Sequence, residues 1–309
     1  MFSNVLRGVM LSVARSRGIR RVFEKYGLRE TGGFARRFIA GSSLEDAVNS
    51  IKELNKKGMT ATLDLLGEDT NNLEDAENSS AKYLEILDAI EKEKLDSNVS
   101  LKLTQMGLDI GEKACQDVVE KIIKKAAEYN NFVRIDMEDS DHTDVTLRIF
   151  FNLREKYDNV GIVIQSYLYR SEADIDKINK SKSRVRICKG AYKEPKTVAY
   201  PSKKDVDNNF LLITKKLLTE GIYPGVATHD EKMVEGAIKL AQDNSINKKD
   251  FEFQMLYGIR RDLQEKLITD GYNVRIYVPF GTEWFPYFSR RLAERPANVF
   301  FIMKNFFRG

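Results

Sequence analysis

The chain of 309 residues is 42% hydrophobic and 31% charged, which is enough apolar material to bury a full core. Its formal net charge of +4 is small and its lysines and glutamates are spread out, so a nucleic-acid-binding surface is not indicated. Two cysteines, Cys115 and Cys188, argue against a disulfide framework and predict a reducing, cytoplasmic compartment. The two histidines, His142 and His229, lack the spacing of metal ligands, so we expect neither a metal centre nor a serine triad.

The segment 1–27 is rich in arginine and carries apolar residues at helical spacing. A transit peptide and a basic amphipathic helix on anionic lipid both have this pattern. A first helix that packs on the domain with its arginines in water explains the pattern more simply. No apolar run is long enough to span a bilayer, so we expect at most peripheral membrane contact.

From residue 59 onward, β-rich runs alternate with charged segments whose apolar residues have helical spacing. The runs expected to form strands are 60–66, 99–104, 132–137, 160–165, 184–190, 223–229, 251–256 and 273–280. This alternation predicts an α/β fold, a (β/α)8 TIM-type barrel, with no G-x-G-x-x-G motif to favour a doubly wound sheet. We expect one domain over 1–309, with extra N-terminal helices in 1–58, the barrel in 59–300 and a tail at 301–309.

Several of the expected strands carry polar groups on one face, because side chains alternate between the two faces of a strand. Lys102, Asp136 and Tyr277 each oppose an aliphatic face of their own strand. Barrel enzymes place their chemistry at the carboxyl ends of the strands, whereas a purely structural barrel would fill these layers with branched aliphatic residues. The pattern therefore predicts an enzyme.

The residues expected to face the barrel interior include more cations than anions. These residues are Lys102, Asp136, Gln165, Arg186, His229 and Tyr277, together with Arg290, Arg291 and Glu294 from a last helix. The residues Tyr287, Arg290, Arg291 and Glu294 have the spacing of one helix face. Because two adjacent guanidinium groups suit a carboxylate, we expect a substrate that carries one.

Five segments, in order along the chain, resemble proline dehydrogenase. They are RIDMED (134–139), RICKGAYKEP (186–195), VATHD (226–230), FEFQMLYG (251–258) and YVPFGTEWFPYFSRRLAERPAN (277–298). The resemblance implies a compact monofunctional flavoprotein that oxidises L-proline to Δ1-pyrroline-5-carboxylate by hydride transfer to N5 of FAD. This is the first step of proline catabolism, and a quinone or another acceptor would receive the electrons.

The resemblance also implies roles for single residues. Arg290 and Arg291 match the pair that binds the substrate carboxylate, and Glu294 matches the acid that pairs with the substrate-binding cations. Asp136 and Arg186 match catalytic residues, Arg186 near the flavin N5. Other substrate-site matches are Lys102, Tyr192 and Tyr277, and the flavin-lining matches are Met137, Gln165, Lys189, Gly190, Ala191, Thr228 and His229. Cys188 and Lys193 are mild departures from the family pattern.

Three alternative functions are compatible with a barrel of this kind. A Schiff-base aldolase would employ Lys102 or Lys189 as a nucleophile inside the barrel. A non-catalytic barrel would bind a carboxylate without chemistry. A flavoenzyme of the folate-reductase type would share the barrel but would not need the arginine pair.

Overall fold

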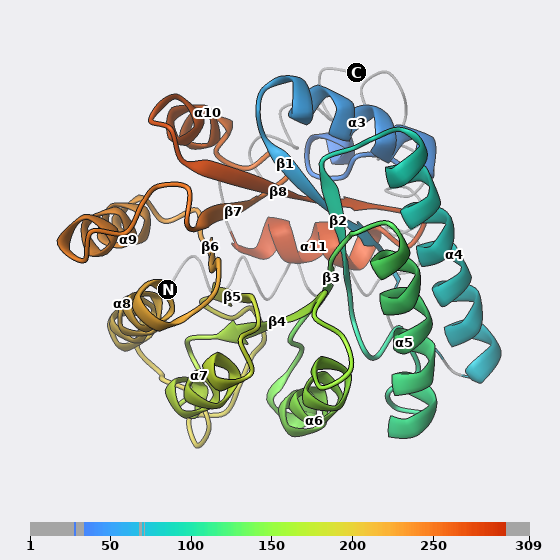
Figure 1. Cartoon of the computed structure of the whole chain (residues 1–309), viewed down its shortest axis with the longest axis horizontal. Helices are drawn as coiled ribbons and strands as arrows, with labels where there is room; N and C mark the ends of the chain where they lie inside the picture. Colours follow the sequence, from blue (N-terminus) through green and yellow to red (C-terminus); the bar gives the residue numbers. More distant parts are fainter. Residues whose placement is uncertain (1–27, 29–33, 68–69, 71, 295–309) are drawn as a thin grey trace.

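The computed structural model describes residue 28, residues 34–67, residue 70 and residues 72–294. Its centre is a closed barrel of eight strands, each parallel to its neighbours and following chain order (Figure 1). The strands are β1 (Thr60–Leu65), β2 (Ser97–Leu101), β3 (Val133–Ile135), β4 (Val160–Gln165), β5 (Val185–Cys188), β6 (Gly225–Ala227), β7 (Glu252–Leu256) and β8 (Asn273–Phe280). The predicted (β/α)8 fold is confirmed.

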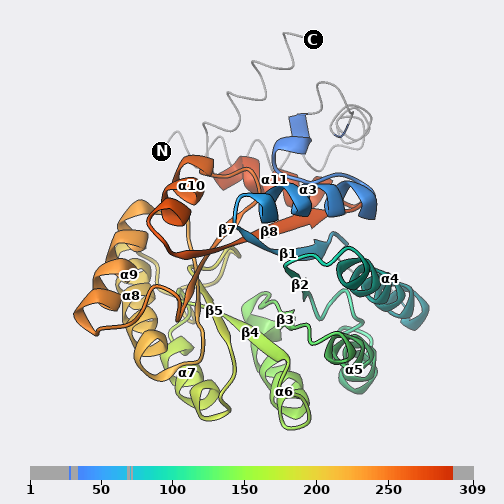
Figure 2. The same ribbon diagram turned by 45° about the horizontal axis from the view of Figure 1, so that its top comes forward.

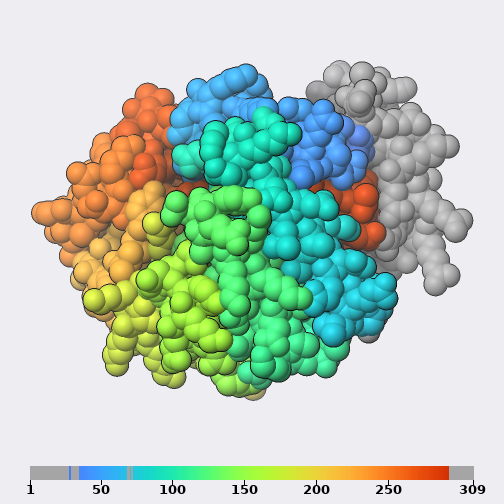
Figure 3. Space-filling view, turned by 45° about the vertical axis from the view of Figure 1, so that its right-hand side comes forward, coloured from blue at the N-terminus to red at the C-terminus, as the bar shows by residue number. Residues whose placement is uncertain are grey.

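A ring of helices surrounds the barrel (Figure 1 and Figure 2). Several helices begin at side chains that accept a backbone N–H of the first turn, as Ser43, Asn72 and Ser202 do. The helices of the ring are α3 (Leu44–Lys56), α4 (Leu73–Lys92), α5 (Glu112–Glu128), α6 (Thr143–Arg154), α7 (Ser171–Lys180), α8 (Lys203–Glu220), α9 (Glu231–Asp243) and α10 (Arg261–Thr269). In the space-filling view, α3, α4 and α5 cover one side of the barrel (Figure 3).

The two ends of the described chain are arranged differently from the repeating units. Helix α3 packs on β1 and β8, where the barrel closes. Helix α11 (Phe285–Glu294) follows β8 after a short loop and lies across the centre of the barrel at its carboxyl end (Figure 1). Of the segment 1–58, where extra helices were expected, the structure describes α3 and the short 3-10 helix η1 (Phe34–Arg37). The arginine-rich segment 1–27 and the expected tail 301–309 lie outside the described residues.

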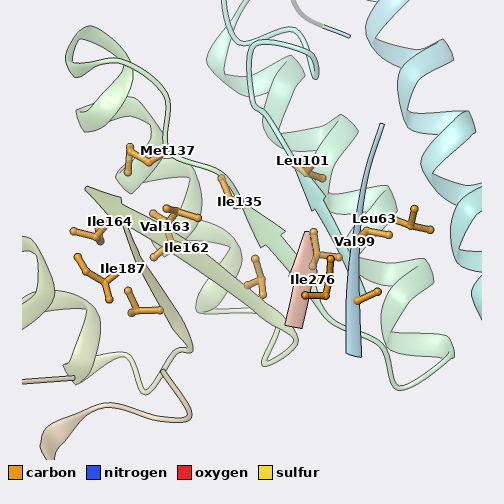
Figure 4. Close-up of a cluster of buried hydrophobic side chains, with 14 of the residues drawn as sticks. Leu63, Val99, Leu101, Ile135, Met137, Ile162, Val163, Ile164, Ile187 and Ile276 are labelled. Carbon is orange, nitrogen blue, oxygen red and sulfur yellow. The ribbon is translucent and has the colours of Figure 1, made fainter. Parts of the chain in front are cut away.

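Two apolar layers hold these parts together. The main layer fills the space between strands and helices and includes Leu63, Leu101 and Ile135 (Figure 4). A second layer fixes α11 against η1 and includes Phe38 and Phe288, whose ring centroids are 6.2 Å apart. The aliphatic faces of the strands therefore point to the helices, which leaves the polar faces inside the barrel, as the alternation predicted.

Strand ends differ from the sequence expectation in one systematic way. β2 ends at Leu101 rather than at residue 104, because the chain turns and the Met106 N–H donates to the carbonyl of Lys102. β3 likewise ends at Ile135, so Lys102 and Asp136 each directly follow a strand. Within the described part of the chain, no helix combines the length and apolar character needed to cross a membrane.

Candidate active site

Asp136 is the centre of a hydrogen-bonded cluster at the carboxyl end of the barrel. Its Oδ1 accepts from Ser100 Oγ at 2.5 Å and from Arg186 Nη1 at 2.8 Å. Its Oδ2 accepts from the Tyr277 hydroxyl at 2.8 Å and from Lys102 Nζ at 3.3 Å. Ser100, Arg186 and Tyr277 come from β2, β5 and β8, and Lys102 directly follows β2. Side chains of strands that are not neighbours meet in this way inside a barrel. The structure therefore brings together Lys102, Arg186, Tyr277 and Asp136.

Lys102 lies between two carboxylates, with Nζ 3.3 Å from both Asp64 Oδ1 and Asp136 Oδ2. Burial acts to lower the pKa of Lys102, but Asp64, Tyr277 and Asp136 outweigh it and raise that pKa well above its ordinary value. Burial acts to raise the pKa of Asp136, but Lys102 and Arg186 outweigh it and lower that pKa. For Asp64 burial dominates, and its pKa is raised. Lys102 is therefore held as an ammonium ion beside an ionised Asp136.

Arg186 is almost fully enclosed, with 8% of its side chain exposed. Besides Asp136, its guanidinium contacts Gln254, which accepts a hydrogen bond from Nε. The Arg186 Cζ lies 5.2 Å from the centroid of the Tyr277 ring, a cation–π distance. A buried cation with fixed contacts can stabilise negative charge on a neighbouring group without having to reorient.

The predicted cofactor-lining residues at the ends of β4 and β6 lie on either side of β5. Gln165 ends β4 and donates from Nε2 to the carbonyl of Glu138 at 2.7 Å, next to the buried Met137. Thr228 and His229 follow β6. The Nε2 of His229 accepts from the backbone N–H of Leu256, the last residue of β7, at 2.8 Å, which places the proton of the neutral ring on Nδ1.

Lys189, directly after β5, is held by acids from two helix starts. Its Nζ lies 2.5 Å from Asp207 Oδ1 and 2.7 Å from Asp230 Oδ2. Lys203 also pairs with both aspartates, at 3.1 Å from Asp230. Burial acts to raise the pKa of Asp230, but Lys189 and Lys203 outweigh it and lower that pKa to about 2. Lys189 is therefore a fixed cation at the edge of the barrel.

Gly190 follows Lys189 with a φ of +109°, a conformation that favours glycine. A Cβ at this position would lie 2.4 Å from a ring carbon of Tyr167. The next residues, Ala191 and Tyr192, are exposed, so the predicted Tyr192 lies at the rim rather than in the Asp136 cluster.

The same loop is fixed further along by Glu194. Its carboxylate accepts from the Ser140 N–H at 2.8 Å and from the Ser140 hydroxyl. The Tyr167 hydroxyl donates to it at 3.3 Å. Glu194 thus connects the loop after β5 to the loop after β3.

Helix α11 carries the predicted arginine pair over the barrel mouth. Arg290 and Arg291 are partly buried, and the Cζ of Arg291 lies 5.1 Å from the centroid of the Tyr287 ring. Glu294 is the last residue of α11, and its side chain lies outside the described part of the structure. The helix thus adds two arginines to the mouth, above Lys102 and Arg186, which are paired with Asp64 and Asp136.

Sequence reasoning missed three residues of the cluster: Asp64, Ser100 and Gln254. Each lies on the polar face of its own strand, within TATLDL, SNVSL and EFQML. The period-two pattern that found Lys102 and Asp136 would have found them too. Among the residues that the structure describes, no group of three or more His, Cys, Asp or Glu side chains could hold a metal ion.

His142 at the rim gives the fold a predictable pH dependence. Its Nδ1 lies 2.6 Å from Asp139 Oδ1 and its Nε2 lies 2.9 Å from Asp109 Oδ1. Partial burial acts to lower the pKa of His142, but the hydrogen bonds to Asp109 and Asp139 outweigh it and raise that pKa to about 8. The stabilisation is fully present below the ordinary value of 6.5 and is lost as pH rises through about 8.

Urea unfolding of the protein and of a His142→Gln variant at about pH 6 and about pH 9 measures this contribution. We expect the difference in unfolding free energy between the two proteins to shrink at the higher pH. An equal difference at both pH values would exclude the stabilising pairing of His142 with Asp109 and Asp139.

Comparison with known proteins agrees with this geometry. A family model described as proline dehydrogenase matches residues 47–304. Proline dehydrogenase 1 of Bacillus subtilis is 41% identical over 300 residues, covering 97% of this chain and 98% of that protein. The proline dehydrogenase of Deinococcus radiodurans is 38% identical over 314 residues, covering 100% of both. The chain belongs to the proline dehydrogenase family.

Larger proteins contain a similar barrel. The solved structure of proline utilization A from Bdellovibrio bacteriovorus, inactivated by N-propargylglycine, has a TM-score of 0.81 and 26% identity over 93% of this chain and 38% of that chain. The bifunctional protein PutA of Escherichia coli is 27% identical over 355 residues, covering 98% of this chain and 27% of that protein. As a proline dehydrogenase family member, the chain is an oxidoreductase of proline catabolism.

Proposed function

We propose that the protein oxidises L-proline to Δ1-pyrroline-5-carboxylate, with FAD as its cofactor and a quinone or another oxidant as the final electron acceptor. Family membership supports proline as the substrate. The observation that carries the proposal is the cluster of Lys102, Asp136, Arg186 and Tyr277 inside the barrel mouth, beneath a helix that carries two adjacent arginines.

The substrate carboxylate would bind Arg290 and Arg291 through charge-assisted hydrogen bonds, with Lys102 as a third cation. Glu294 would pair with these cations and limit their mutual repulsion. The side chains that would wall the proline ring are Tyr192 and Tyr277. Because Lys102 is already held by acids on both sides, its position is fixed before a substrate arrives.

The residues around the ends of β3 to β6 fit a flavin by their chemistry. They offer an enclosed cation in Arg186, and at Gly190 a main chain whose φ of +109° favours glycine and which packs closely on the Tyr167 ring. The residues that would hold FAD are Met137, Gln165, Arg186, Lys189, Gly190, Ala191, Thr228 and His229. When bound, the flavin supplies two-electron redox chemistry by taking the hydride at N5.

The oxidation removes a hydride from C5 of proline and a proton from its nitrogen, which leaves a C=N bond. The substrate would react with its amine unprotonated. Arg186 would stabilise the negative charge that develops beside it. Asp136 would hold Arg186, Lys102 and Tyr277 in place through the hydrogen bonds described above.

A Schiff-base mechanism is disfavoured by the same contacts. A nucleophilic lysine must lose its proton, which requires a lowered pKa. The acids around Lys102 raise its pKa instead, and Lys189 is paired with two aspartates. Neither lysine has the surroundings of an aldolase nucleophile.

Anaerobic titration of the FAD-loaded protein with L-proline tests the proposal. We expect the oxidised flavin absorption bands to bleach while Δ1-pyrroline-5-carboxylate accumulates, with D-proline as the matched control. Binding of L-proline without bleaching would indicate a carboxylate-binding module, and borohydride trapping of a keto substrate on lysine would indicate an aldolase.

We also propose a cytoplasmic location with peripheral membrane contact through the arginine-rich segment 1–27, near a quinone acceptor. Anionic lipid attracts such a segment, and apolar side chains on one face of a helix add to the attraction. Cosedimentation with anionic and with neutral vesicles tests the contact. Equal binding to both would contradict it.

A further inference from the structure

We infer that Gln254 is a positioning residue for Arg186, and that Glu252 fixes the orientation of Gln254. The inference rests on the proposed function, in which the Arg186 guanidinium lies beside the bound flavin. It adds a role for a hydrogen-bonded chain that runs from β5 to β7 and β8 inside the barrel.

Gln254 and Arg186 lie on β7 and β5 and meet across the strand between them. The Arg186 Nε donates to Gln254 Oε1, while Nη1 donates to Asp136 Oδ1 at 2.8 Å. Arg186 is 6% exposed and Gln254 is 4% exposed, so bulk water cannot easily replace either contact. A guanidinium held by separate acceptors at two of its nitrogens cannot turn without losing one of them. The plane of the Arg186 guanidinium is thereby fixed.

The amide of Gln254 has only one orientation that suits its neighbours. Its Nε2 donates to Glu252 Oε1 at 2.6 Å, and Arg275 Nε lies 2.8 Å and 3.0 Å from the two Glu252 oxygens. Burial acts to raise the pKa of Glu252, but Arg275 outweighs it and lowers that pKa, so Glu252 is ionised. Because an ionised carboxylate only accepts, the NH2 group of Gln254 must face Glu252 and its carbonyl must face Arg186.

A glycine on β6 independently indicates that this amide has a dedicated place. Gly225 pairs with Arg186 on one side and with Glu252 on the other. A Cβ at Gly225 would lie 2.4 Å from Gln254 Nε2, closer than such atoms approach. A side chain at position 225 would therefore need the space that the Gln254 amide fills.

The consequence concerns the charge beside the cofactor. A cation that is already oriented stabilises developing negative charge without reorganisation. Without the acceptor at Gln254, Arg186 keeps its contacts with Asp136, Ser100 and the Tyr277 ring but loses the one at Nε, so its plane is held less firmly. A bound flavin would then be harder to reduce, while the residues that bind the substrate carboxylate would be unaffected.

The test compares Gln254→Met with the matched control Gln116→Met. Gln116 is also buried and accepts one side-chain hydrogen bond, from Asn152 Nδ2 at 3.0 Å, but it lies on the outer helix α5. For Gln254→Met we expect a more negative reduction potential of the bound flavin and a kcat lower by about tenfold, the scale at which outer supports of catalytic groups act. The KM for proline should stay within about twofold, and Gln116→Met should change neither the potential nor kcat.

A second variant, Gly225→Ala, displaces the amide without removing it and should shift the potential in the same direction. It gives an independent answer if Gln254→Met folds poorly. The inference would be overturned if Gln254→Met or Gly225→Ala had the same flavin reduction potential and kcat as Gln116→Met. If the flavin of the unaltered protein still bleached with proline, the proposed function would remain intact. An unaltered protein that does not bleach would overturn both.

Discussion

Replacing Arg290 and Arg291 together by methionine should raise the KM for proline by about 10²-fold to 10⁴-fold. Each charge-assisted hydrogen bond contributes about 1.5–3 kcal/mol, and the double change removes both guanidinium groups from the proposed carboxylate site. Helix α11 should remain in place, because Trp284 and Phe288 anchor it in the apolar layer beneath, with ring centroids 5.5 Å apart. Steady-state kinetics with proline, together with the flavin content of the purified variant, measure the effect.

A second arginine doublet offers a control of equal charge. Arg260 and Arg261 stand at the start of α10, and Arg260 is paired with Asp262. Converting both to methionine removes two charges at α10 and leaves the arginine pair of α11 intact, and KM should change by less than about threefold. If the Arg290→Met, Arg291→Met protein had the same KM for proline as this control, α11 would not bind the substrate carboxylate.

Replacing Asp136 by alanine should destabilise the protein by about 3–5 kcal/mol, because it leaves Lys102 and Arg186 as buried cations without their shared partner. Activity should fall with it, since both cations lose their fixed positions. Because the pKa of Asp136 is lowered in the fold, this stabilisation is present above the ordinary value of 3.8 and is lost as pH falls below it. Urea unfolding at neutral pH measures the loss.

Asp88 provides the contrast at the surface. It also accepts from a tyrosine hydroxyl and pairs with a lysine, at 2.6 Å from Tyr129 and 3.0 Å from Lys125, but 55% of its side chain is exposed. Asp88→Ala should therefore change stability by less than about 1 kcal/mol. Equal losses for the Asp136→Ala and Asp88→Ala variants would mean that the inner cluster is not the stabilising unit described here.

The sequence allowed the barrel and part of its interior to be predicted, because strand alternation is a local property. Lys102, Asp136 and Tyr277 were found from that alternation, and Asp64 and Gln254 follow the same pattern in strands where it was not applied. The partners of Lys189 could not be found this way. Asp207 and Asp230 reach it from the starts of two different helices, and only the packing of those helices determines that meeting.

The boundaries of the strands were predicted less well than the strands themselves. Lys102, Asp136 and Thr228 were expected inside strands, yet each follows one. The chain leaves the sheet where side chains take over its backbone groups, as when Glu138 Oε1 accepts the N–H of Thr104 at 3.0 Å. Such contacts join residues far apart in sequence and have no local signal.

The packing of α3 against both β1 and β8 also bears on how the protein is made. β1 leaves the ribosome early, but its partner Arg275 on β8 is synthesised more than two hundred residues later. Until then the strand edge and the underside of α3 lack their final neighbours, and exposed edges of this kind favour wrong association. Contacts so distant in sequence also slow folding. Newly synthesised chains should therefore depend on chaperones until the final strand closes the ring.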